Sequence, residues 1–145
     1  MFKDLSLFII KPNAIKKNVI GEIISMIEKD GLRIVALKSL WMDEEQAKAF
    51  YIVHRGKEFY ESLCKFMSSG PIVVGIVKGE SAVKRLRKIM GETDPKVADK
   101  DTIRGRFGDD IQKNAIHGSD SLETAEREIK FFFSENEIIK LLRER

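Results

Sequence analysis

The chain has 145 residues, of which 43% are hydrophobic and 34% are charged, so it is long enough to bury one core and is expected to form a single domain over residues 1–145. The net charge of only +3 does not require a nucleic acid as a partner, although it permits a local phosphate site. One cysteine and two histidines exclude an internal disulfide and are too few for a usual zinc site.

Two strands and a helix are predicted in the first third of the chain. Residues 5–11 (LSLFIIK) form a short apolar run of the buried-strand type, with no small-residue cleavage site of a signal peptide after it. Asn13 offers a helix N-cap, and residues 18–29 continue with apolar side chains at helical spacing. Residues 33–41 (RIVALKSLW) are rich in branched side chains and predict the second strand.

The middle third predicts three helices around a third strand. Residues 42–56 predict a helix capped by Asp43, and residues 57–69 predict another helix. Residues 71–78 (PIVVGIVK) are continuously apolar, which is typical of a strand buried on both faces. Residues 80–90 then predict a cationic helix.

The last third begins with a long segment, residues 91–114, that lacks clear periodicity. Loops of this length in compact domains are usually functional. Residues 114–119 (NAIHGS) predict a short last strand, after which Asp120 or Ser121 would cap a helix. The tail SENEIIKLLRER is amphipathic and predicts a further helix.

The order of these elements limits the fold class and the chemistry. Strands alternate with helices, which indicates an α/β or α+β fold, and an antiparallel sheet covered by helices on one side suits this order. No run approaches the roughly 18 apolar residues of a membrane helix, so we expect a soluble, cytoplasmic protein without a membrane partner. The sequence contains no P-loop and no Rossmann fingerprint, so side chains would have to bind any phosphate.

The segment NAIHGSD places a histidine, His117, at the end of the expected last strand. Gly118 would leave the imidazole open on one side, and Ser119 and Glu128 could both reach the ring from the turn and the next helix. A carboxylate beside an imidazole fixes its tautomer and supports its positive charge. The alternative is an ordinary turn histidine, with Glu128 on a solvated helix face.

Three cationic residues stand at positions where sites are usually built. Lys11 ends the first strand, Arg87 lies on the helix after the third strand, and Arg104 lies in the long loop with Thr93. Three cations and a histidine suit phosphoryl transfer, which depends on positioning and charge stabilisation. For any one of them alone, a solubilising surface role is the alternative.

Together these segments resemble the nucleoside diphosphate kinase family. NAIHGSD is accompanied by FIIKPNA, VIGEII, FMSSGPIV, MGETDP and TIRGRFG, in the order and spacing of that family, from about residue 5 to about residue 133. The resemblance implies a ferredoxin-like fold, a four-stranded antiparallel sheet covered by helices. It also implies reversible transfer of the terminal phosphate from a nucleoside triphosphate, typically ATP, to a nucleoside diphosphate by a ping-pong mechanism, through a phosphohistidine at His117.

The resemblance also assigns roles to individual residues. Tyr51 would lie close to His117 and the phosphate, and Ser119 and Glu128 would hold the imidazole. The residues that would contact the phosphates are Lys11, Arg87, Thr93 and Arg104, and those that would bind the ribose hydroxyls are Asn114 and Lys11.

The base would lie between two apolar side chains. Phe59 resembles the aromatic residue that stacks on the base, with Ile111 on the opposite face and Leu63 nearby. Stacking accepts any base, which implies broad base tolerance. From the residues alone, a place in the helix core is the alternative for Phe59 and Tyr60.

The resemblance further implies Mg²⁺ as cofactor and a homo-oligomer, with a hexamer favoured over a tetramer. The Mg²⁺ would arrive on the nucleotide phosphates with little direct protein ligation, and Asp120 would touch it through water, cap the next helix, or do both. The chain departs from the usual family pattern at Asn13, Val53, Glu58 and Arg106. Glu58 implies looser helices around the base, and Arg106 puts loop and subunit contacts in doubt.

Two other classes of function remain open from the sequence. One is a nucleotide-binding regulatory protein that keeps the fold without turnover. The other is a ferredoxin-like module that binds nucleic acid, suggested by the pI of about 8.9, although the aromatic-rich sheet motif of such modules is missing.

Overall fold

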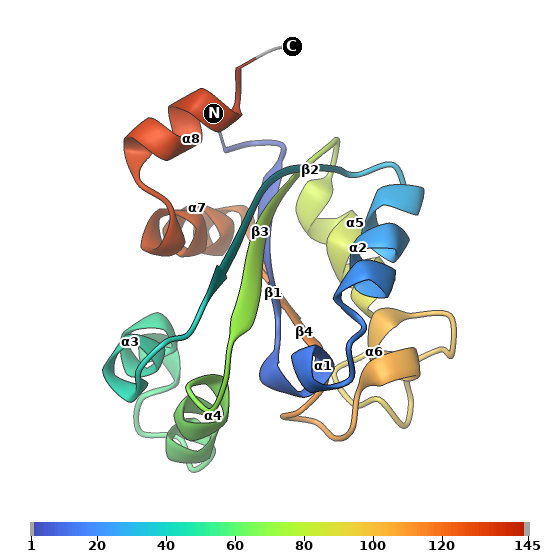
Figure 1. The fold of residues 1–145 in the computed structure, drawn as a ribbon, viewed down its shortest axis with the longest axis vertical. Coiled ribbons are helices and arrows are strands. Elements are labelled where there is room, and N and C mark those ends of the chain that lie inside the picture. Colours follow the sequence, from blue (N-terminus) through green and yellow to red (C-terminus); the bar gives the residue numbers. More distant parts are fainter. Residues whose placement is uncertain (1, 144–145) are drawn as a thin grey trace.

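Four strands form one antiparallel sheet in the order β2-β3-β1-β4 (Figure 1). The computed structural model describes residues 2–143. The strands are β1 (Leu5–Ile10), β2 (Arg33–Leu40), β3 (Ile72–Lys78) and β4 (Ile116–Gly118). This antiparallel order confirms the ferredoxin-like sheet that the resemblance implied.

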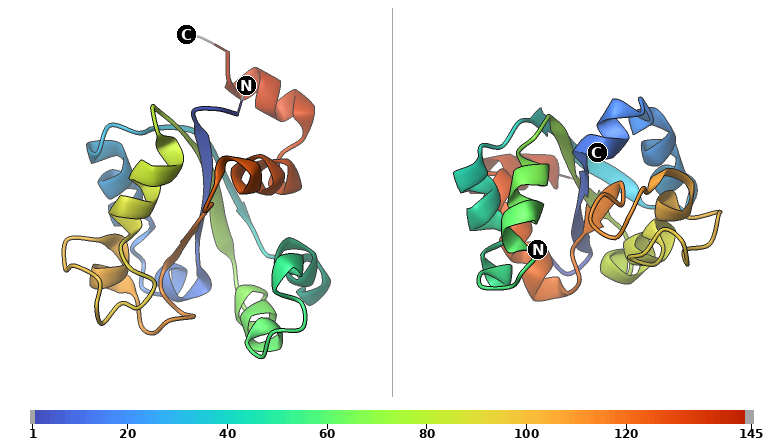
Figure 2. Two further views of the ribbon diagram at one scale, coloured as in Figure 1. Left: turned by 180° about the vertical axis from the view of Figure 1, so that it is seen from behind. Right: turned by 90° about the horizontal axis from the view of Figure 1, so that it is seen from below.

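The helices cover both faces of the sheet, so the expectation of helices on one side was wrong (Figure 2). One face carries α3 (Glu44–Phe50), α4 (Tyr60–Met67), α7 (Leu122–Phe132) and α8 (Glu135–Leu141). The other carries α1 (Pro12–Lys16), α2 (Ile20–Lys29), α5 (Ala82–Met90) and α6 (Ile103–Phe107). A short 3-10 helix, η1 (Ile52–His54), follows α3.

Strand β1 explains why both faces need cover, because all six of its residues are buried. Its side chains alternate between two hydrophobic clusters: Leu7 and Ile9 belong to one, and Phe8 and Ile10 to the other. A strand that is buried at every position must have a packed layer on each side.

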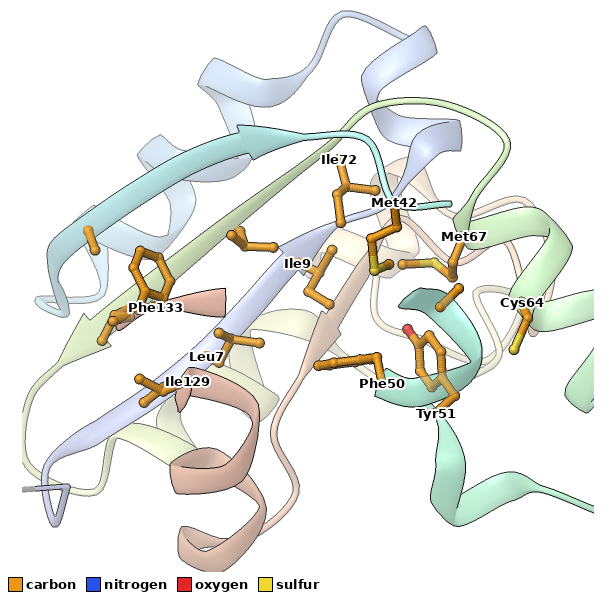
Figure 3. Close-up of a cluster of buried hydrophobic side chains, with 14 of the residues drawn as sticks. Leu7, Ile9, Met42, Phe50, Tyr51, Cys64, Met67, Ile72, Ile129 and Phe133 are labelled. Atoms are coloured by element: carbon orange, nitrogen blue, oxygen red, sulfur yellow. The ribbon is translucent and has the colours of Figure 1, made fainter. Parts of the chain in front are cut away.

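The cluster on the α3 and α7 face leads directly to the candidate site. Phe50 and Tyr51, where α3 ends, pack in it beside Leu7 and Ile9 of β1 (Figure 3). Cys64 of α4 is fully buried in the same cluster, as expected of a core residue. The end of α3 is therefore fixed by core packing.

The helix starts confirm one predicted cap, decide between two candidates for a second and correct a third. Asp43 caps α3, where its side chain accepts a hydrogen bond from the Gln46 backbone and completes a capping box. The cap of α7 is Ser121, not Asp120. Asn13 is not a cap, because it lies inside α1, where Pro12 takes the first turn.

The long segment between α5 and β4 contains one short helix that the sequence pattern did not predict. Helix α6 begins after Thr102, whose hydroxyl accepts a hydrogen bond from the Gly105 backbone. Five residues with a glycine among them are too few to show helical periodicity. None of the helices within residues 2–143 is long and apolar enough to cross a membrane.

We predict that Asp43→Ala lowers the free energy of unfolding by about 1 kcal/mol, because it removes the N-cap of α3. Asp43→Asn should restore most of the loss, since asparagine caps as well as aspartate. Urea unfolding followed by circular dichroism measures both variants. Equal losses in the two variants would show that the cap is not the cause.

Candidate functional site

His117 lies on β4, opposite Ile9 of β1. This pairing puts its ring on the face of the sheet that α3 and α7 cover. The centroid of the ring lies 5.4 Å from that of Phe50 and 5.9 Å from that of Tyr51. The side chain remains 19% exposed, so a ligand can reach it while two aromatic rings limit its rotation.

A carboxylate holds one nitrogen of this ring. Nε2 of His117 lies 2.9 Å from Oε1 of Glu128, a buried residue of α7. When Nε2 carries the proton and donates it to that carboxylate, the lone pair of the neutral ring is on Nδ1. Ser119, which was expected at the ring itself, instead donates from its hydroxyl to the same Glu128 oxygen over 2.7 Å.

Gly118 has a different role from the expected one. Successive residues of a strand point to opposite faces, so the missing side chain of Gly118 lies away from the imidazole. An added Cβ there would be 2.4 Å from the sulfur of Met90. Glycine at this position lets α5 pack closely on β4.

Two arginines are anchored on the backbone at either side of His117. Arg104 donates to the Ile116 carbonyl over 2.9 Å and to the Gly91 carbonyl over 3.1 Å. Arg87 donates to the Gly118 carbonyl over 3.3 Å. Burial, together with the charge of Arg87, lowers the pKa of Arg104 to about 10. An anion bound between the two guanidinium groups would reduce their repulsion.

Lys11 is the third cation and is buried at the end of β1. Its ammonium donates to the Gln112 carbonyl over 3.2 Å. Burial, with the charge of Arg104 second, lowers the pKa of Lys11 to about 7, although Asp110 opposes the shift. A buried ammonium near a buried guanidinium provides a strong electrostatic reason to bind an anion.

Several buried polar atoms at the site have no hydrogen-bond partner among residues 2–143: the hydroxyl of Tyr51, Oδ1 of Asn114 and Nε of Arg104. Burial also raises the pKa of Tyr51, so its hydroxyl keeps its proton. Buried polar groups are normally paired. These three atoms are therefore free to bond a polar ligand.

Asn114 also fastens the long loop next to the site. Its amide group donates to the carbonyls of Thr93 and Ile111, over 3.0 Å and 2.9 Å. Thr93 is exposed, so its hydroxyl is open to a ligand while its backbone is held.

The two candidate base contacts are exposed apolar side chains. Phe59 is 44% exposed and Ile111 is 62% exposed, while Leu63 is buried. Phe59 immediately precedes α4, so the alternative of a helix-core position fails for it, although Tyr60 next to it is buried.

Sequence reasoning missed the second histidine, His54, which lies between these two parts of the site. Its ring centroid is 6.3 Å from that of Tyr51 and 5.1 Å from that of Phe59, and its Nδ1 is 3.1 Å from the Lys57 ammonium. Burial, then Lys57 and His117, lower the pKa of His54. In the sequence, the signal that could have pointed to His54 was Lys57, which follows it by three residues.

Two departures from the family pattern have partners inside this chain. Asn13 donates to the Asp109 carboxylate over 2.9 Å, and Arg106 lies 3.3 Å from the Glu22 carboxylate. Val53 and Glu58 are exposed near η1 and α4. The first two replacements are thus accommodated by local contacts.

The part of the chain that the structure describes contains no group of three or more His, Cys, Asp or Glu side chains that could hold a metal ion. Asp120 is exposed two residues from the end of β4. Arg87 and Arg104, which bond the carbonyls of β4, suit phosphate oxygens rather than a bare divalent ion.

Comparisons with known proteins identify the relatives of this chain. A family model described as nucleoside diphosphate kinase matches residues 4–138. A nucleoside diphosphate kinase of Legionella pneumophila is 53% identical over 138 residues, which cover 95% of this chain and 98% of that protein. Another, of Wolbachia sp. subsp. Brugia malayi, is 52% identical over 136 residues, which cover 94% of this chain and 98% of that protein.

Solved structures agree with the family match. The nucleoside diphosphate kinase of Aquifex aeolicus has a TM-score of 0.89 and 46% identity, and the match covers 92% of this chain and 97% of that one. That of Halobacterium salinarum, solved in complex with CDP, has a TM-score of 0.89 and 36% identity, with coverage of 93% and 90%.

We predict that ADP binding takes up close to one proton at pH 8, because the pKa of Lys11 of about 7 leaves the free amine mostly neutral there. The affinity for ADP should therefore fall as the pH rises from 7 to 9, because protonating Lys11 becomes more costly. Lys11→Arg stays charged and should bind without this uptake. Calorimetry in buffers of different ionisation enthalpy counts the proton, and equal uptake by both proteins would exclude Lys11 as its source.

Proposed function

The chain belongs to the nucleoside diphosphate kinase family, and we propose that it transfers the terminal phosphate between nucleotides by a ping-pong mechanism through a phosphohistidine at His117. It is a phosphotransferase, as its relatives are named. The observation that carries the mechanism is the part-exposed ring with Nε2 on Glu128 and two arginines anchored on either side.

In the first half-reaction, the lone pair of Nδ1 attacks the terminal phosphorus of a nucleoside triphosphate. The N–P bond forms as the bond from phosphorus to the bridging oxygen breaks, and the electron pair leaves with the diphosphate. The ring becomes cationic, and the Glu128 carboxylate, within 2.9 Å of Nε2, stabilises that charge. A second diphosphate reverses these steps and takes the phosphate.

The cations would hold the phosphates while the phosphoryl group moves. Lys11 directly follows β1, Arg87 lies in α5 and Arg104 lies in α6, while Thr93 adds an exposed hydroxyl. Charge spreads over the oxygens in the transition state, so fixed cations lower its energy more than that of the ground state. The unpaired Tyr51 hydroxyl is well placed by its ring contact with His117 to donate to a phosphate oxygen.

The nucleoside would extend from the phosphates towards α4. The unpaired Oδ1 of Asn114 supports a role as acceptor for a ribose hydroxyl, with Lys11 as the donor. The base would lie between Phe59 and Ile111, whose exposure supports stacking, with Leu63 beneath. Contact with π-faces alone gives broad tolerance of bases.

Membership of this kinase family implies a need for a divalent ion, and we propose that Mg²⁺ is bound to the nucleotide. When bound, it would neutralise charge on the phosphate oxygens. Asp120 is the exposed carboxylate that could reach it through water, a role now separate from helix capping.

We further propose one domain over residues 1–145, a cytoplasmic location and a homo-oligomer, a hexamer rather than a tetramer. Both hydrophobic clusters pack on one sheet, which supports the single domain. Exposed Val97, in the loop that follows α5, supports a subunit contact there. The proposed partners are ATP and other nucleoside tri- and diphosphates.

The enzyme should acquire an acid-labile phosphate from γ-labelled ATP with Mg²⁺, and His117→Ala should acquire none, because it lacks the nucleophile. Filter binding before and after acid treatment measures the label. His54→Ala, which removes the other imidazole, should still be labelled. Absence of label on the unaltered protein would favour the regulatory, non-catalytic alternative, and label surviving in His117→Ala would place the chemistry elsewhere.

We predict that Glu128→Ala lowers kcat about ten- to a hundredfold, because a hydrogen bond to a charged group is worth roughly 1.5–3 kcal/mol. Ser119→Ala should cost less, since its hydroxyl acts through Glu128. Steady-state rates with ATP and a second diphosphate test the order of the two effects. A larger loss for Ser119→Ala would mean that the hydroxyl contacts the reacting groups directly.

A further inference from the structure

Within residues 2–143, one side-chain hydrogen bond connects the two proposed walls of the base slot. Nε2 of Gln112 donates to Oγ of Ser62 over 3.0 Å. Gln112 directly follows Ile111 on one wall, and Ser62 lies in α4, next to Leu63 and three residues after Phe59, on the other. These two residues are 50 positions apart in the sequence.

The wall that carries Ile111 is a tight turn. The Lys113 carbonyl accepts hydrogen bonds from the backbone of Asp109 and Asp110, over 2.7 Å and 3.3 Å. The Asp110 carboxylate in turn accepts from the backbone of Gln112 and Lys113, over 3.0 Å and 2.6 Å. These bonds fix the backbone on both sides of Ile111.

The same turn is anchored to α1. Asn13 donates to the Lys113 carbonyl over 2.8 Å as well as to the Asp109 carboxylate. The Lys17 ammonium lies 2.7 Å from the other oxygen of that carboxylate and 2.8 Å from the Phe107 carbonyl. These bonds make the turn and α1 one rigid unit, and none of them runs to α4.

The wall that carries Phe59 is fixed in its own way. The Ser62 hydroxyl accepts from Gln112 and donates to the Phe59 carbonyl over 3.1 Å, so it connects the incoming bond to the stacking residue itself. The neighbouring Tyr60 hydroxyl donates to the Lys48 carbonyl over 2.8 Å and fastens α4 to α3.

We propose that the Gln112–Ser62 hydrogen bond sets the spacing between Phe59 and Ile111 and so makes Gln112 and Ser62 positioning residues that determine nucleotide selectivity. The inference rests on the proposed function, because it takes those two side chains as the base contacts. Both walls are held independently, and this bond spans them.

The expected consequence depends on the size of the base. Stacking energy grows with the overlapping area, and a purine overlaps both walls more than a pyrimidine does. Loss of the bond should widen the slot and weaken purines more than pyrimidines. The reaction at His117 should be unaffected, because neither side chain contacts the ring and the Gln112 carbonyl that accepts from Lys11 is a backbone group, which an alanine substitution keeps.

The test separates base binding from chemistry at the histidine. The protein is loaded with phosphate from phosphoramidate, which has no base, and then discharged by ADP, GDP, CDP or UDP in single turnovers. For Gln112→Ala we expect the half-saturating concentration of ADP and GDP to rise about three- to tenfold. That of CDP and UDP should rise less. The maximal discharge rate and the rate of loading by phosphoramidate should stay within about twofold of those of the unaltered protein.

Matched variants identify the bond as the cause. Ser62→Ala should behave like Gln112→Ala, the double variant should be no worse than either single one, and Ser62→Thr, which keeps the hydroxyl, should behave like the unaltered protein. Ser69→Ala is the control, because Ser69 also donates to a carbonyl three residues earlier, that of Phe66, at the far end of α4.

Each remaining outcome overturns the inference. If Gln112→Ala changes nucleotide half-saturation no more than Ser69→Ala does, the bond does not set the slot. If loading by phosphoramidate falls as much as nucleotide discharge, Gln112 acts on the histidine instead. If the unaltered protein takes phosphate from neither phosphoramidate nor ATP, the proposed function fails and the inference falls with it.

Discussion

The pairing of β4 with β1 is the constraint on which the candidate site depends. It puts His117 opposite Ile9, on the face where Glu128 of α7 reaches Nε2. The same three-residue strand offers the carbonyls of Ile116 and Gly118, and each binds one arginine. The candidate nucleophile and two of the candidate phosphate-binding cations are thus located by one short piece of backbone, so their spacing follows from strand geometry.

The site concentrates positive charge at a cost to the folded chain. Lys11 and Arg104 are buried, which lowers the pKa of both, and the charge of Arg104 lowers that of Lys11 further, as the charge of Arg87 does for Arg104. Unpaired atoms such as the Tyr51 hydroxyl add to this cost. Such an arrangement is a general feature of sites that are organised before the ligand arrives, because an anion with several oxygens offsets the repulsion and pairs the free atoms together.

Much of the fold could be predicted from periodicity, because the strands are short apolar runs and Asp43 is a recognisable cap. The two-sided cover could have been inferred from the four consecutive apolar residues at positions 7–10 of β1. The roles of Ser119 and Gly118 could not, since the direction of a side chain depends on strand register, which a sequence motif does not give. The turn that carries Gln112 was also beyond reach, because its bonds join residues about a hundred positions apart.

The distance along the chain between β1 and β4 has a consequence for biosynthesis. Lys11 is made early, whereas His117 and Glu128 are made near the end, so a nascent polypeptide on the ribosome lacks the edge strand that completes the sheet until translation is almost finished. The backbone edge of β1 then lacks its hydrogen-bonding partner for most of that time. Catalytic competence and structural completion therefore coincide, and a truncated translation product would have neither.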